Sequence, residues 1–334
     1  MLLLSRQTLL EASLALLLLV VVPALLVVLF DPVLDHAKRN TLANQVSLAY
    51  YAEGRLCESD CLYSELRQGG GVDLSVIVPA YNEEARLPVM LDSALPYLKE
   101  WSAKEGKSYE VVISDDHSTD GTKRYVLDMA AKDSSIRLLS LDRNCGKGGA
   151  VRRGVQYARG RYILMADADG ATEISDLSKL WDGLQTIQVL DKVGDKMGVS
   201  IGSRAHLEKQ SIATRSWVRT VLMRGFHFLV TLLCTKNVRD TQCGFKLFTR
   251  KAARILFSNL HLEGWTFDIE LIYMAEALGV PLTETAVRWH EVDGSKLIQS
   301  RIDIVVTSLK MARDMLCLRL AYLSGIWKIN PHAH

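Results

Sequence analysis

The sequence lacks several features that would place it in a familiar class at once. It contains no Asn-x-Ser/Thr glycosylation acceptor, so nothing in it requires a lumenal or extracellular catalytic domain. Its six cysteines have neither the paired spacing of a zinc site nor the density of a disulfide scaffold, and only Cys57 and Cys61 lie close together. We interpret them as free thiols. The formal net charge of only +2 argues against a strongly polyanion-binding protein, and we expect no nucleic-acid partner.

Two familiar ligand-binding loops are also missing. The glycine-rich stretch 144–150 is neither a Walker loop nor the Gly-x-Gly-x-x-Gly of a dinucleotide fold. It could still place backbone amides and Lys147 beside a phosphate at the start of a helix. The stretch 116–121 begins like a calcium loop, but its twelfth position is Leu127 rather than glutamate, which excludes that interpretation.

A long apolar run is present near the amino terminus. From Ala12 to Phe30 there are nineteen residues without a charge, close to the roughly 20 that span a bilayer. We predict an uncleaved membrane anchor in residues 1–30 rather than a signal peptide, because no small-residue cleavage site follows the run. The flanking charges leave its orientation open. Residues 31–72, which end in three glycines, are predicted to be a juxtamembrane helix and a flexible joint.

From Leu74 onward, short β-branched runs alternate with segments of helical spacing. The predicted strands are 74–78, 110–114, 136–141, 162–166 and 199–202, and the predicted helices are 87–98, 122–132, 147–158 and 176–190. Strands and helices that alternate in this way form a mostly parallel sheet with helices on both faces. The sequence therefore predicts an α/β fold.

Acidic residues follow the ends of three predicted strands. Glu83 follows the first, Asp115 and Asp116 end the second, and Asp167 and Asp169 follow the fourth. Because the carboxyl ends of parallel strands meet at one sheet edge, these side chains are expected to share a crevice. Two carboxylates separated by one residue suit Mg²⁺ or Mn²⁺ in a phosphate-handling site. An isolated Asp-x-Asp would more often be a polar turn, so the neighbouring strand ends carry this prediction.

The chain becomes basic after Gly202. Between Arg204 and Arg254, eleven Lys or Arg residues face two acidic ones. The apolar run 225–235 lies in this strip and is too short to span a bilayer, while 302–327 is apolar but carries charges. We expect two amphipathic helices lying in the membrane interface, with ordinary core helices as the alternative. Together with the anchor, they indicate a membrane-bound enzyme with a lipid substrate.

Several motifs resemble those of the inverting GT-A glycosyltransferases that use nucleotide sugars. These are the stretches 75–84, 114–118, 167–169 and 202–204. Four longer strings are similar to the dolichyl-phosphate β-glucosyltransferase family of the endoplasmic reticulum, and they are 143–150, 165–172, 202–208 and 239–248. Two positions depart from the related patterns: His117 replaces a usual glycine, and Cys243 replaces the serine that precedes Gly-Phe in mannosyl enzymes.

The resemblance implies a hexosyltransferase that moves glucose from UDP-glucose to dolichyl phosphate, with inversion, at the cytosolic face of the endoplasmic reticulum membrane. It also implies roles for individual residues. Nucleotide-sugar binding falls to Pro79, Tyr81, Glu83, Asp115, Asp116, Lys147, Asp167, Asp169 and Gln242; metal binding to Asp167 and Asp169; acceptor-phosphate binding to Arg204, Arg215, Arg219 and Arg224; and catalysis to Asp167, Asp169, Arg204, Arg219 and Asp268. Arg239, Asp240 and Lys246 would shape the floor of the site, and Glu270 is a second candidate base beside Asp268.

The predicted organisation is an anchor (1–30), a juxtamembrane segment (31–72), a nucleotide-sugar half (73–203) and an acceptor and membrane half (204–334). Two alternatives remain open from sequence. One is the same reaction with GDP-mannose as donor, and the other is an inactive lipid-binding scaffold that keeps the fold. The metal, the lipid length and the oligomeric state are not determined by the sequence, and an oligomer is possible.

Overall fold

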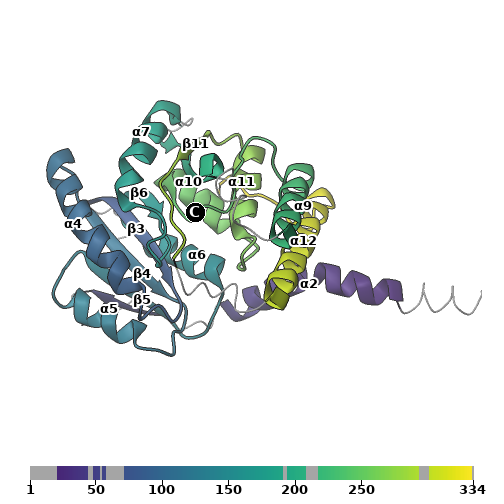
Figure 1. Cartoon of the computed structure of the whole chain (residues 1–334), viewed down its shortest axis with the longest axis horizontal. Coiled ribbons are helices and arrows are strands. Elements are labelled where there is room, and N and C mark those ends of the chain that lie inside the picture. The colour runs from purple at the N-terminus through teal and green to yellow at the C-terminus, as the bar shows by residue number, and fades with distance from the viewer. Residues whose placement is uncertain are drawn as a thin grey trace, which may run out of the picture.

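The structure is a computed structural model of the whole chain, and the description below covers residues 21–43, 48–52, 55–57, 71–190, 194–207, 217–292 and 301–332. Its centre is a nine-stranded sheet in the order β11-β9-β10-β6-β3-β4-β5-β1-β2, with helices on both faces (Figure 1). The predicted α/β fold with a mostly parallel sheet is confirmed.

The elements have the following bounds. The strands are β1 Leu48–Ala52, β2 Arg55–Cys57, β3 Val72–Ala80, β4 Tyr109–Asp115, β5 Ile136–Leu141, β6 Gly160–Met165, β7 Val189–Leu190, β8 Lys196–Met197, β9 Val199–Ser203, β10 Lys246–Thr249 and β11 Leu282–Ala286. The helices are α2 Val22–Ala43, α4 Leu87–Glu105, α5 Thr122–Ala130, α6 Lys147–Tyr157, α7 Leu177–Ile187, α9 Trp217–Leu233, α10 Arg250–Ser258, α11 Phe267–Ala277 and α12 Arg301–Leu323, with short 3₁₀ turns at Ile174–Asp176 and Ala205–Leu207.

Four parallel strands form the part of the sheet that positions the site. β3 pairs in parallel with β4 on one side and with β6 on the other, and β4 pairs in parallel with β5. β10 lies between β6 and β9 and runs antiparallel to both. The five strands predicted between residues 74 and 202 are all present, and the predicted helices lie between them.

Alternation along the buried strands divides the core into two layers. Val76 and Val78 on β3 pack in the layer that contains α4, α5 and α7. Ile77, which points to the opposite face, packs in the layer that contains α6, α10 and α11. Because both faces of β3 are covered, its side chains form a continuous apolar run rather than an alternating one.

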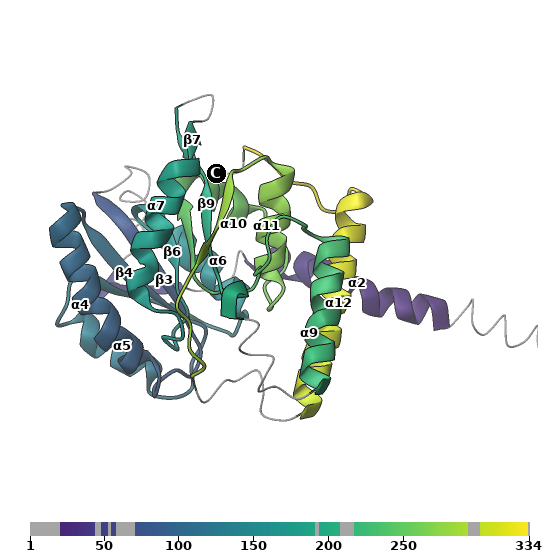
Figure 2. The same cartoon turned by 45° about the horizontal axis from the view of Figure 1, so that its top comes forward.

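Three helices lie together beside the sheet. In both views α9, α12 and α2 lie next to one another at one side of the domain (Figures 1 and 2). Val230 of α9 and Met315 of α12 are buried in one small cluster with Ile269 of α11. Phe30 and Val33 of α2 pack against a second cluster, which joins Leu262 of the α10–α11 loop to buried residues of α12 such as Leu318. These two clusters attach the helical layer to the α/β domain.

The structure differs from the predicted juxtamembrane segment 31–72. Residues 48–52 form β1, which pairs antiparallel with β5, and β2 pairs with β1, so the sheet continues beyond the predicted boundary. The physical reason is that β5 would otherwise be an exposed edge, and Tyr50 of β1 buries its ring against that layer. Cys57 lies at the end of β2, and Cys61 lies outside the described residues.

The predicted anchor is only partly covered by the described residues. Residues 1–20 lie outside them, while 21–30 begin the helix that projects from the domain (Figure 1). Among the residues that the structure describes, no helix is both long enough and apolar enough to cross a membrane.

Candidate active site

The acidic strand ends meet at one edge of the sheet, as predicted. Asp115 is the last residue of β4, while Asp167 and Asp169 follow the end of β6. β3 lies between these two strands and runs parallel to both, so all three carboxylates stand at its carboxyl side. Tyr81 and Glu83 follow β3 itself. The residues predicted to bind the donor from the ends of β3, β4 and β6 therefore share one edge of the sheet.

Asp167 forms an ion pair with the first residue of α6. The ammonium nitrogen of Lys147 lies 2.7 Å from its Oδ1. Burial favours the neutral acid, but Lys147, with Lys246 and Arg204 nearby, outweighs it and lowers the pKa of Asp167. The same pairing raises the pKa of Lys147 against the effect of its burial. Both groups therefore stay charged near neutral pH.

The Asp167 carboxylate also lies directly against Gly244. A Cβ atom at position 244 would overlap the Oδ2 and Cγ atoms of Asp167. Only glycine leaves room for this approach, because any side chain would push the carboxylate away. Gly244 belongs to the segment that precedes β10, which pairs with β6, so the antiparallel return of the chain closes the back of the site.

Asp169 is held more loosely. One oxygen accepts a hydrogen bond from the amide of Ala171 at 3.0 Å, and the other lies 4.0 Å from a guanidinium nitrogen of Arg86. Burial and the neighbouring Asp167 raise its pKa. About 29% of its side chain is exposed, so its carboxylate can reach a ligand.

Arg86 is a site residue that the sequence interpretation missed. Its guanidinium donates to both oxygens of Glu83, at 2.7 and 2.6 Å, and approaches Asp169 as well. It therefore connects the loop after β3 with the loop after β6. The Glu-x-x-Arg spacing just before α4 was the available signal, because residues three apart face each other on a helical turn.

The loop after β3 and the loop after β4 are joined by hydrogen bonds. The Asn82 Oδ1 accepts from the amide of Thr119 at 2.7 Å, and Ser118 accepts from the amide of Asn82 at 2.8 Å. Asn82 and His117 both have positive φ angles, of 53° and 64°. His117 thus adopts the backbone conformation of the glycine that it replaces, which answers the question raised by that substitution.

Within these loops the predicted residues fall into two groups. Tyr81 is 40% exposed, whereas Asp115 is buried and accepts a hydrogen bond from the amide of Ser118. Pro79 lies inside β3 and has no free amide to offer. Glu83 is 8% exposed and held by Arg86, so it acts on the loop rather than as a freely exposed ligand-binding group.

Asp116 holds the glycine-rich loop. Its two oxygens accept from the amides of Cys145 and Gly146, at 2.6 and 2.9 Å. Burial is the largest influence on this carboxyl and raises its pKa to about 6, although the two amide hydrogen bonds oppose that shift. Asp116 was predicted to bind the nucleotide sugar, but the structure assigns both of its oxygens to the loop.

The second half of the chain contributes two further ion pairs. Arg204 and Asp240 form a bidentate pair, with nitrogen–oxygen distances of 2.7 and 2.9 Å. Lys246 and Asp268 form a buried pair at 2.5 Å. Burial raises the pKa of Asp268, and the lysine opposes that rise. Because Lys246 is committed to Asp268, this carboxylate is not a freely exposed base.

The other predicted residues of this half lie as follows. Glu270 is fully buried and accepts from the amides of His261 and Leu262, away from the acidic edge. Gln242 approaches the sulfur of Met311 on α12 at 4.0 Å. Arg224 is exposed on α9; Arg219 lies on the same helix, although its side chain is outside the described set, and Arg215 falls in a segment that the description does not cover.

The donor set of the predicted metal site consists of Asp167 and Asp169. Within the described part of the chain, no group of three or more His, Cys, Asp or Glu side chains is arranged to hold a metal ion. Two hard oxygen donors on one turn nevertheless fit Mg²⁺ or Mn²⁺, which keep several water or phosphate ligands. Asp167 and Asp169 can therefore supply two of the ligands of such an ion, and water or a substrate would supply the others.

Two cavities lie near the sheet edges. One of about 10 Å³ lies beside Asp167, between Met90 of α4 and Phe245, and has room for about one water molecule. A larger one of about 1310 Å³ is lined by Asp73, Arg161 and neighbours at the amino ends of β3 and β6, the opposite edge from the acidic residues.

Comparison with known proteins identifies the family. The model of glycosyl transferase family 2 matches residues 75–257. The dolichyl-phosphate beta-glucosyltransferase of Mus musculus is 52% identical over 260 residues, covering 77% of this chain and 78% of that protein. Those of Homo sapiens and Saccharomyces cerevisiae are 50% and 43% identical over 77% of this chain, and the matches cover 78% and 77% of those proteins.

The chain belongs to the dolichyl-phosphate β-glucosyltransferases, within glycosyl transferase family 2. The family predicted from the motifs is thus confirmed. A solved structure of glucosyl-3-phosphoglycerate synthase from Mycobacterium tuberculosis, in complex with Mn²⁺, uridine-diphosphate and phosphoglyceric acid, is also similar, with a TM-score of 0.47 and 20% identity over 78% of this chain and 81% of that chain.

The structure of this family member brings several of the predicted site residues together. Asp115, Asp167, Asp169 and Lys147 stand at one edge of the sheet. The bidentate Arg204–Asp240 pair lies close enough for Arg204 to influence Asp167 electrostatically. The contribution of α9 to the site is described only through its backbone near Arg219.

Proposed function

We propose that this protein transfers glucose from UDP-glucose to dolichyl phosphate with inversion, giving dolichyl β-D-glucosyl phosphate and UDP. The observation that carries the proposal is the identity of 50% or more, over 260 residues, to proteins named for this activity. The acidic edge formed by Asp115, Asp167 and Asp169 supports it, because carboxylates at the carboxyl ends of parallel strands can hold the divalent cation that binds a nucleotide diphosphate. The product would serve lipid-linked oligosaccharide assembly for protein N-glycosylation.

The acceptor needs little activation in this reaction. A phosphate monoester loses its second proton near pH 6, so dolichyl phosphate is already a dianionic nucleophile at neutral pH. A general base is therefore optional. This agrees with the burial of Asp268 and its ion pair with Lys246, which would make it a poor base. We propose that Asp268 orients Lys246 at the floor of the site rather than accepting a proton.

Asp167 and Asp169 would hold Mg²⁺ or Mn²⁺ together with the donor diphosphate. When bound, the ion would neutralise the charge of the departing UDP. Lys147 would share that task through its ammonium group, which already lies at Asp167. Tyr81 and Asp115 would contact the nucleoside from the loops after β3 and β4. Alignment of the donor with the lipid phosphate then supplies most of the catalysis.

Basic residues of the second half would receive the phosphate of the lipid. We assign this role to Arg204, Arg215, Arg219 and Arg224, which follow β9 and enter α9. A planar guanidinium suits phosphate oxygens. Because Arg204 is in a bidentate pair with Asp240, it would act as a preoriented positive charge, and the residues of α9 would make the movable contacts. Residues 73–203 would thus bind the donor and 204–334 the acceptor.

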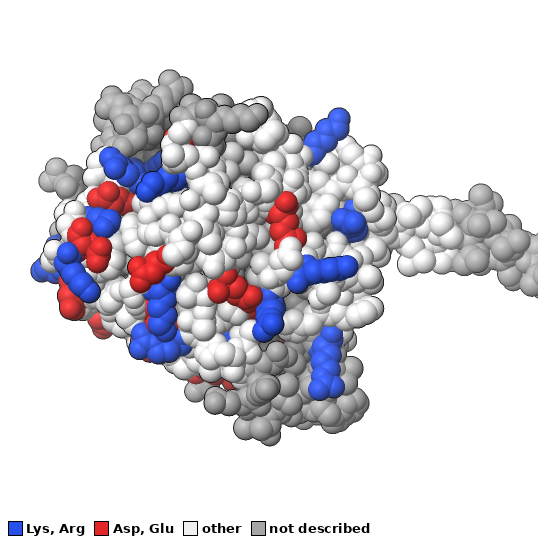
Figure 3. Space-filling view, turned by 90° about the horizontal axis from the view of Figure 1, so that it is seen from above, with Lys and Arg blue, Asp and Glu red and all other residues white. Residues whose placement is uncertain are grey.

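The membrane attachment is part of the same proposal. Residues 12–30 carry no charge and would anchor the chain in the endoplasmic reticulum membrane, with the catalytic domain on the cytosolic side. The described part of this stretch exposes Leu25, Leu26 and Val27 on the projecting part of α2, which is white in the space-filling view (Figure 3). Lys, Arg, Asp and Glu are interspersed over the rest of that face.

A donor panel tests the proposal directly. Purified full-length protein is incubated with dolichyl phosphate and either UDP-glucose or GDP-mannose, with Mn²⁺ or with EDTA. We expect product from UDP-glucose with metal only. Asp169→Asn should lower turnover at least about a hundredfold, the scale lost when a charge-stabilising group is removed. Asp182→Asn, an exposed carboxylate on α7, is the matched control and should have no effect.

Each contrary result identifies a different error. Transfer from GDP-mannose would assign the chain to a mannosyl reaction. No transfer from either donor, with no stabilisation by UDP and metal against thermal unfolding, would favour an inactive scaffold. Full activity in EDTA, or in the Asp169 variant, would remove the metal from the mechanism.

A further inference from the structure

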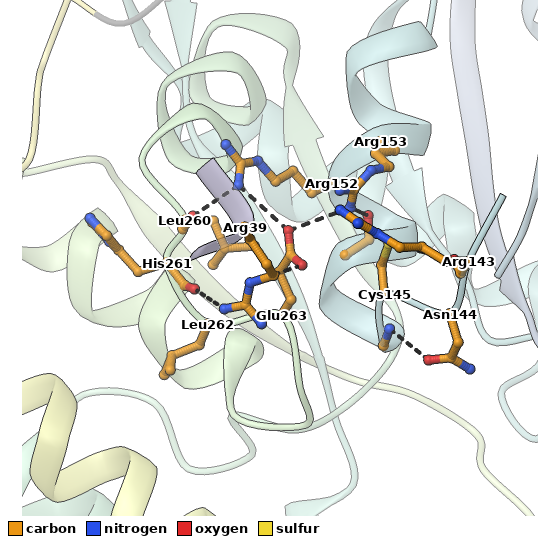
Figure 4. Close-up of polar contacts among 12 residues, drawn as sticks. Arg39, Arg143, Asn144, Cys145, Arg152, Arg153, Leu260, His261, Leu262 and Glu263 are labelled. Atoms are coloured by element: carbon orange, nitrogen blue, oxygen red, sulfur yellow. Dashed lines mark hydrogen bonds and ion pairs between the residues drawn. The ribbon is translucent and has the colours of Figure 1, made fainter. Parts of the chain in front are cut away.

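Glu263 lies at the point where three parts of the chain meet. It follows α10 in the loop that leads to α11, and only 4% of its side chain is exposed. Its carboxylate lies 3.4 Å from a guanidinium nitrogen of Arg153 and 3.7 Å from one of Arg152, both on α6. On the other side, Arg39 of α2 approaches it at 3.4 Å (Figure 4).

The backbone of Glu263 contacts the glycine-rich loop as closely as its side chain contacts the arginines. Its carbonyl oxygen accepts a hydrogen bond from the amide of Gly149 at 3.2 Å. A Cβ atom at Gly146 would lie 2.7 Å from the same oxygen, and Gly146 has a φ of 82°. Gly148 is equally restricted by Phe267. The glycines of this loop are thus explained by packing against residues 263–267.

The loop is therefore held from two sides. Asp116 binds the amides of Cys145 and Gly146 from the end of β4, and Glu263 binds Gly149 from the opposite side. Lys147 lies between these attachment points, and its ammonium reaches Asp167. Any shift of the loop would move this ammonium relative to the acidic edge.

α2 is attached to the same hub. Arg39 donates to the carbonyl oxygen of His261 at 3.2 Å in addition to its pairing with Glu263. The His36 ring lies 4.6 Å from the His261 ring, measured between centroids. The helix that continues toward the predicted anchor thus contacts the loop 261–263, which in turn contacts the glycine-rich loop. The Glu263 carboxylate lies within 4 Å of three guanidinium groups, so its loss would bring these like charges closer to an uncompensated state.

We propose that Glu263 is a positioning residue that fixes Lys147 at the donor site and couples this position to α2 through the Arg39–Glu263 contact. The inference rests on the proposed function, because it gives Lys147 a role beside the donor diphosphate. Glu263 acts only through the loop and does not touch the substrate. Membrane attachment of the amino-terminal helix would then influence donor binding at a distance.

UDP affinity tests this role without requiring any transfer step. Calorimetry of the full-length protein with UDP and Mn²⁺ should show about tenfold weaker binding for Glu263→Gln, which keeps the backbone contact but removes the charge. Arg39→Gln should weaken binding in the same direction. The double variant should bind no more weakly than Glu263→Gln alone, because both changes break one pathway.

The control is Asp31→Asn. It removes the ion pair of α2 with Arg313, a contact of 3.1 Å, and leaves the Arg39–Glu263 contact in place. UDP affinity should stay unchanged in this variant. Wild-type affinity in a folded Glu263→Gln protein, or additive losses in the double variant, would overturn the proposal. If Glu263→Gln does not fold, Arg39→Gln decides alone, since unchanged UDP binding there excludes the coupling. A wild-type protein that binds GDP instead would refute the proposed donor, and the same comparison would then use GDP.

Discussion

At the scale of single residues, the site is organised by compensated charges. Lys147 with Asp167, Arg204 with Asp240 and Lys246 with Asp268 are three close ion pairs around one edge of the sheet. Each acidic partner would be costly to bury alone, and each cation prepares the crevice for the negative charge of a diphosphate or a lipid phosphate. The nearest cation to Asp169 is the guanidinium of Arg86, at 4.0 Å, which is farther than the cations of these three pairs. Asp169 is therefore the carboxylate best placed to become a metal ligand.

Gly244 gives a residue-scale prediction. Gly244→Ala places a methyl group where the Asp167 carboxylate lies, so the carboxylate and its pairing with Lys147 must shift. Because misplacement of a charged group by about 1 Å can cost on the order of a hundredfold, we expect turnover to fall at least about tenfold in a folded protein. Steady-state kinetics with UDP-glucose and dolichyl phosphate measure the loss.

Gly264→Ala is the matched control for this change, because open space surrounds its added methyl group. It should retain wild-type turnover. Equal activity of the two variants would mean that Asp167 tolerates displacement and that the close contact with Gly244 has no catalytic consequence.

At the scale of elements, α9 and α12 form one apolar surface. They pack against each other through Val230 and Met315, while Phe228, Leu232 and Leu309 remain exposed on the outside. Exposed large apolar groups on adjacent helices are typical of a surface that meets a membrane or a partner. The two interfacial helices expected from sequence stay a prediction, for which this exposed surface is the physical motive.

The element-scale prediction concerns this surface. The double substitution Phe228→Ser and Leu232→Ser removes apolar area from α9, where the two side chains are 65% and 61% exposed. We expect the apparent KM for dolichyl phosphate in lipid vesicles to rise at least about threefold, because interfacial binding scales with buried apolar area. The KM for UDP-glucose should not change.

Leu190→Ser serves as the reference, since Leu190 is 67% exposed but lies on the β7–β8 hairpin, away from α9 and α12. A rise in the KM for UDP-glucose, or an equal effect of Leu190→Ser on the lipid, would contradict the assignment of the α9 surface to the membrane.

At the scale of the whole molecule, the amino-terminal segment is part of the fold. α2 buries Phe30 and Val33 against residues near Leu262, and Asp31 pairs with Arg313 of α12. β1 then adds a strand to the sheet next to β5. The packed region therefore has its boundary within α2, near Phe30, and the anchor predicted for residues 1–30 stays a prediction.

Truncation tests this boundary. Deleting residues 1–20 should leave activity in detergent and the free energy of unfolding nearly unchanged. Deleting residues 1–43 removes the packed part of α2 and should lower the free energy of unfolding by roughly 2–4 kcal/mol, the scale of burying two apolar side chains and their contacts. Chemical denaturation in detergent measures both.

The two truncations are informative only as a pair. If the shorter deletion unfolds the protein, residues before α2 carry part of the fold. If the longer deletion is as stable as the full chain, the contacts of Phe30, Val33 and Arg39 contribute nothing measurable, and the coupling proposed through Glu263 loses its mechanical basis.

The sequence by itself determined the succession of the main strands and helices between residues 74 and 202, the acidic edge and the family. These follow from local patterns: β-branched runs between glycine and acidic turns define the strands, and their carboxyl ends bring Asp115, Asp167 and Asp169 to one side. Only the tertiary structure decided which groups are partners. Lys147 meets Asp167, Arg86 meets Glu83 and Asp169, and Gly244 admits a carboxylate, through contacts that mostly join distant parts of the chain.

Contacts between distant parts of the chain also explain why the structure differs from the sequence prediction at the amino terminus and in the glycine-rich loop. The weak strand β1 is stabilised by pairing with β5, which no local pattern around Tyr50 reveals. The loop glycines looked like a phosphate cradle, but Gly146 and Gly148 are required by the approach of Glu263 and Phe267, more than a hundred residues later. Local propensity sets the elements, whereas long-range packing sets the role of each residue within them.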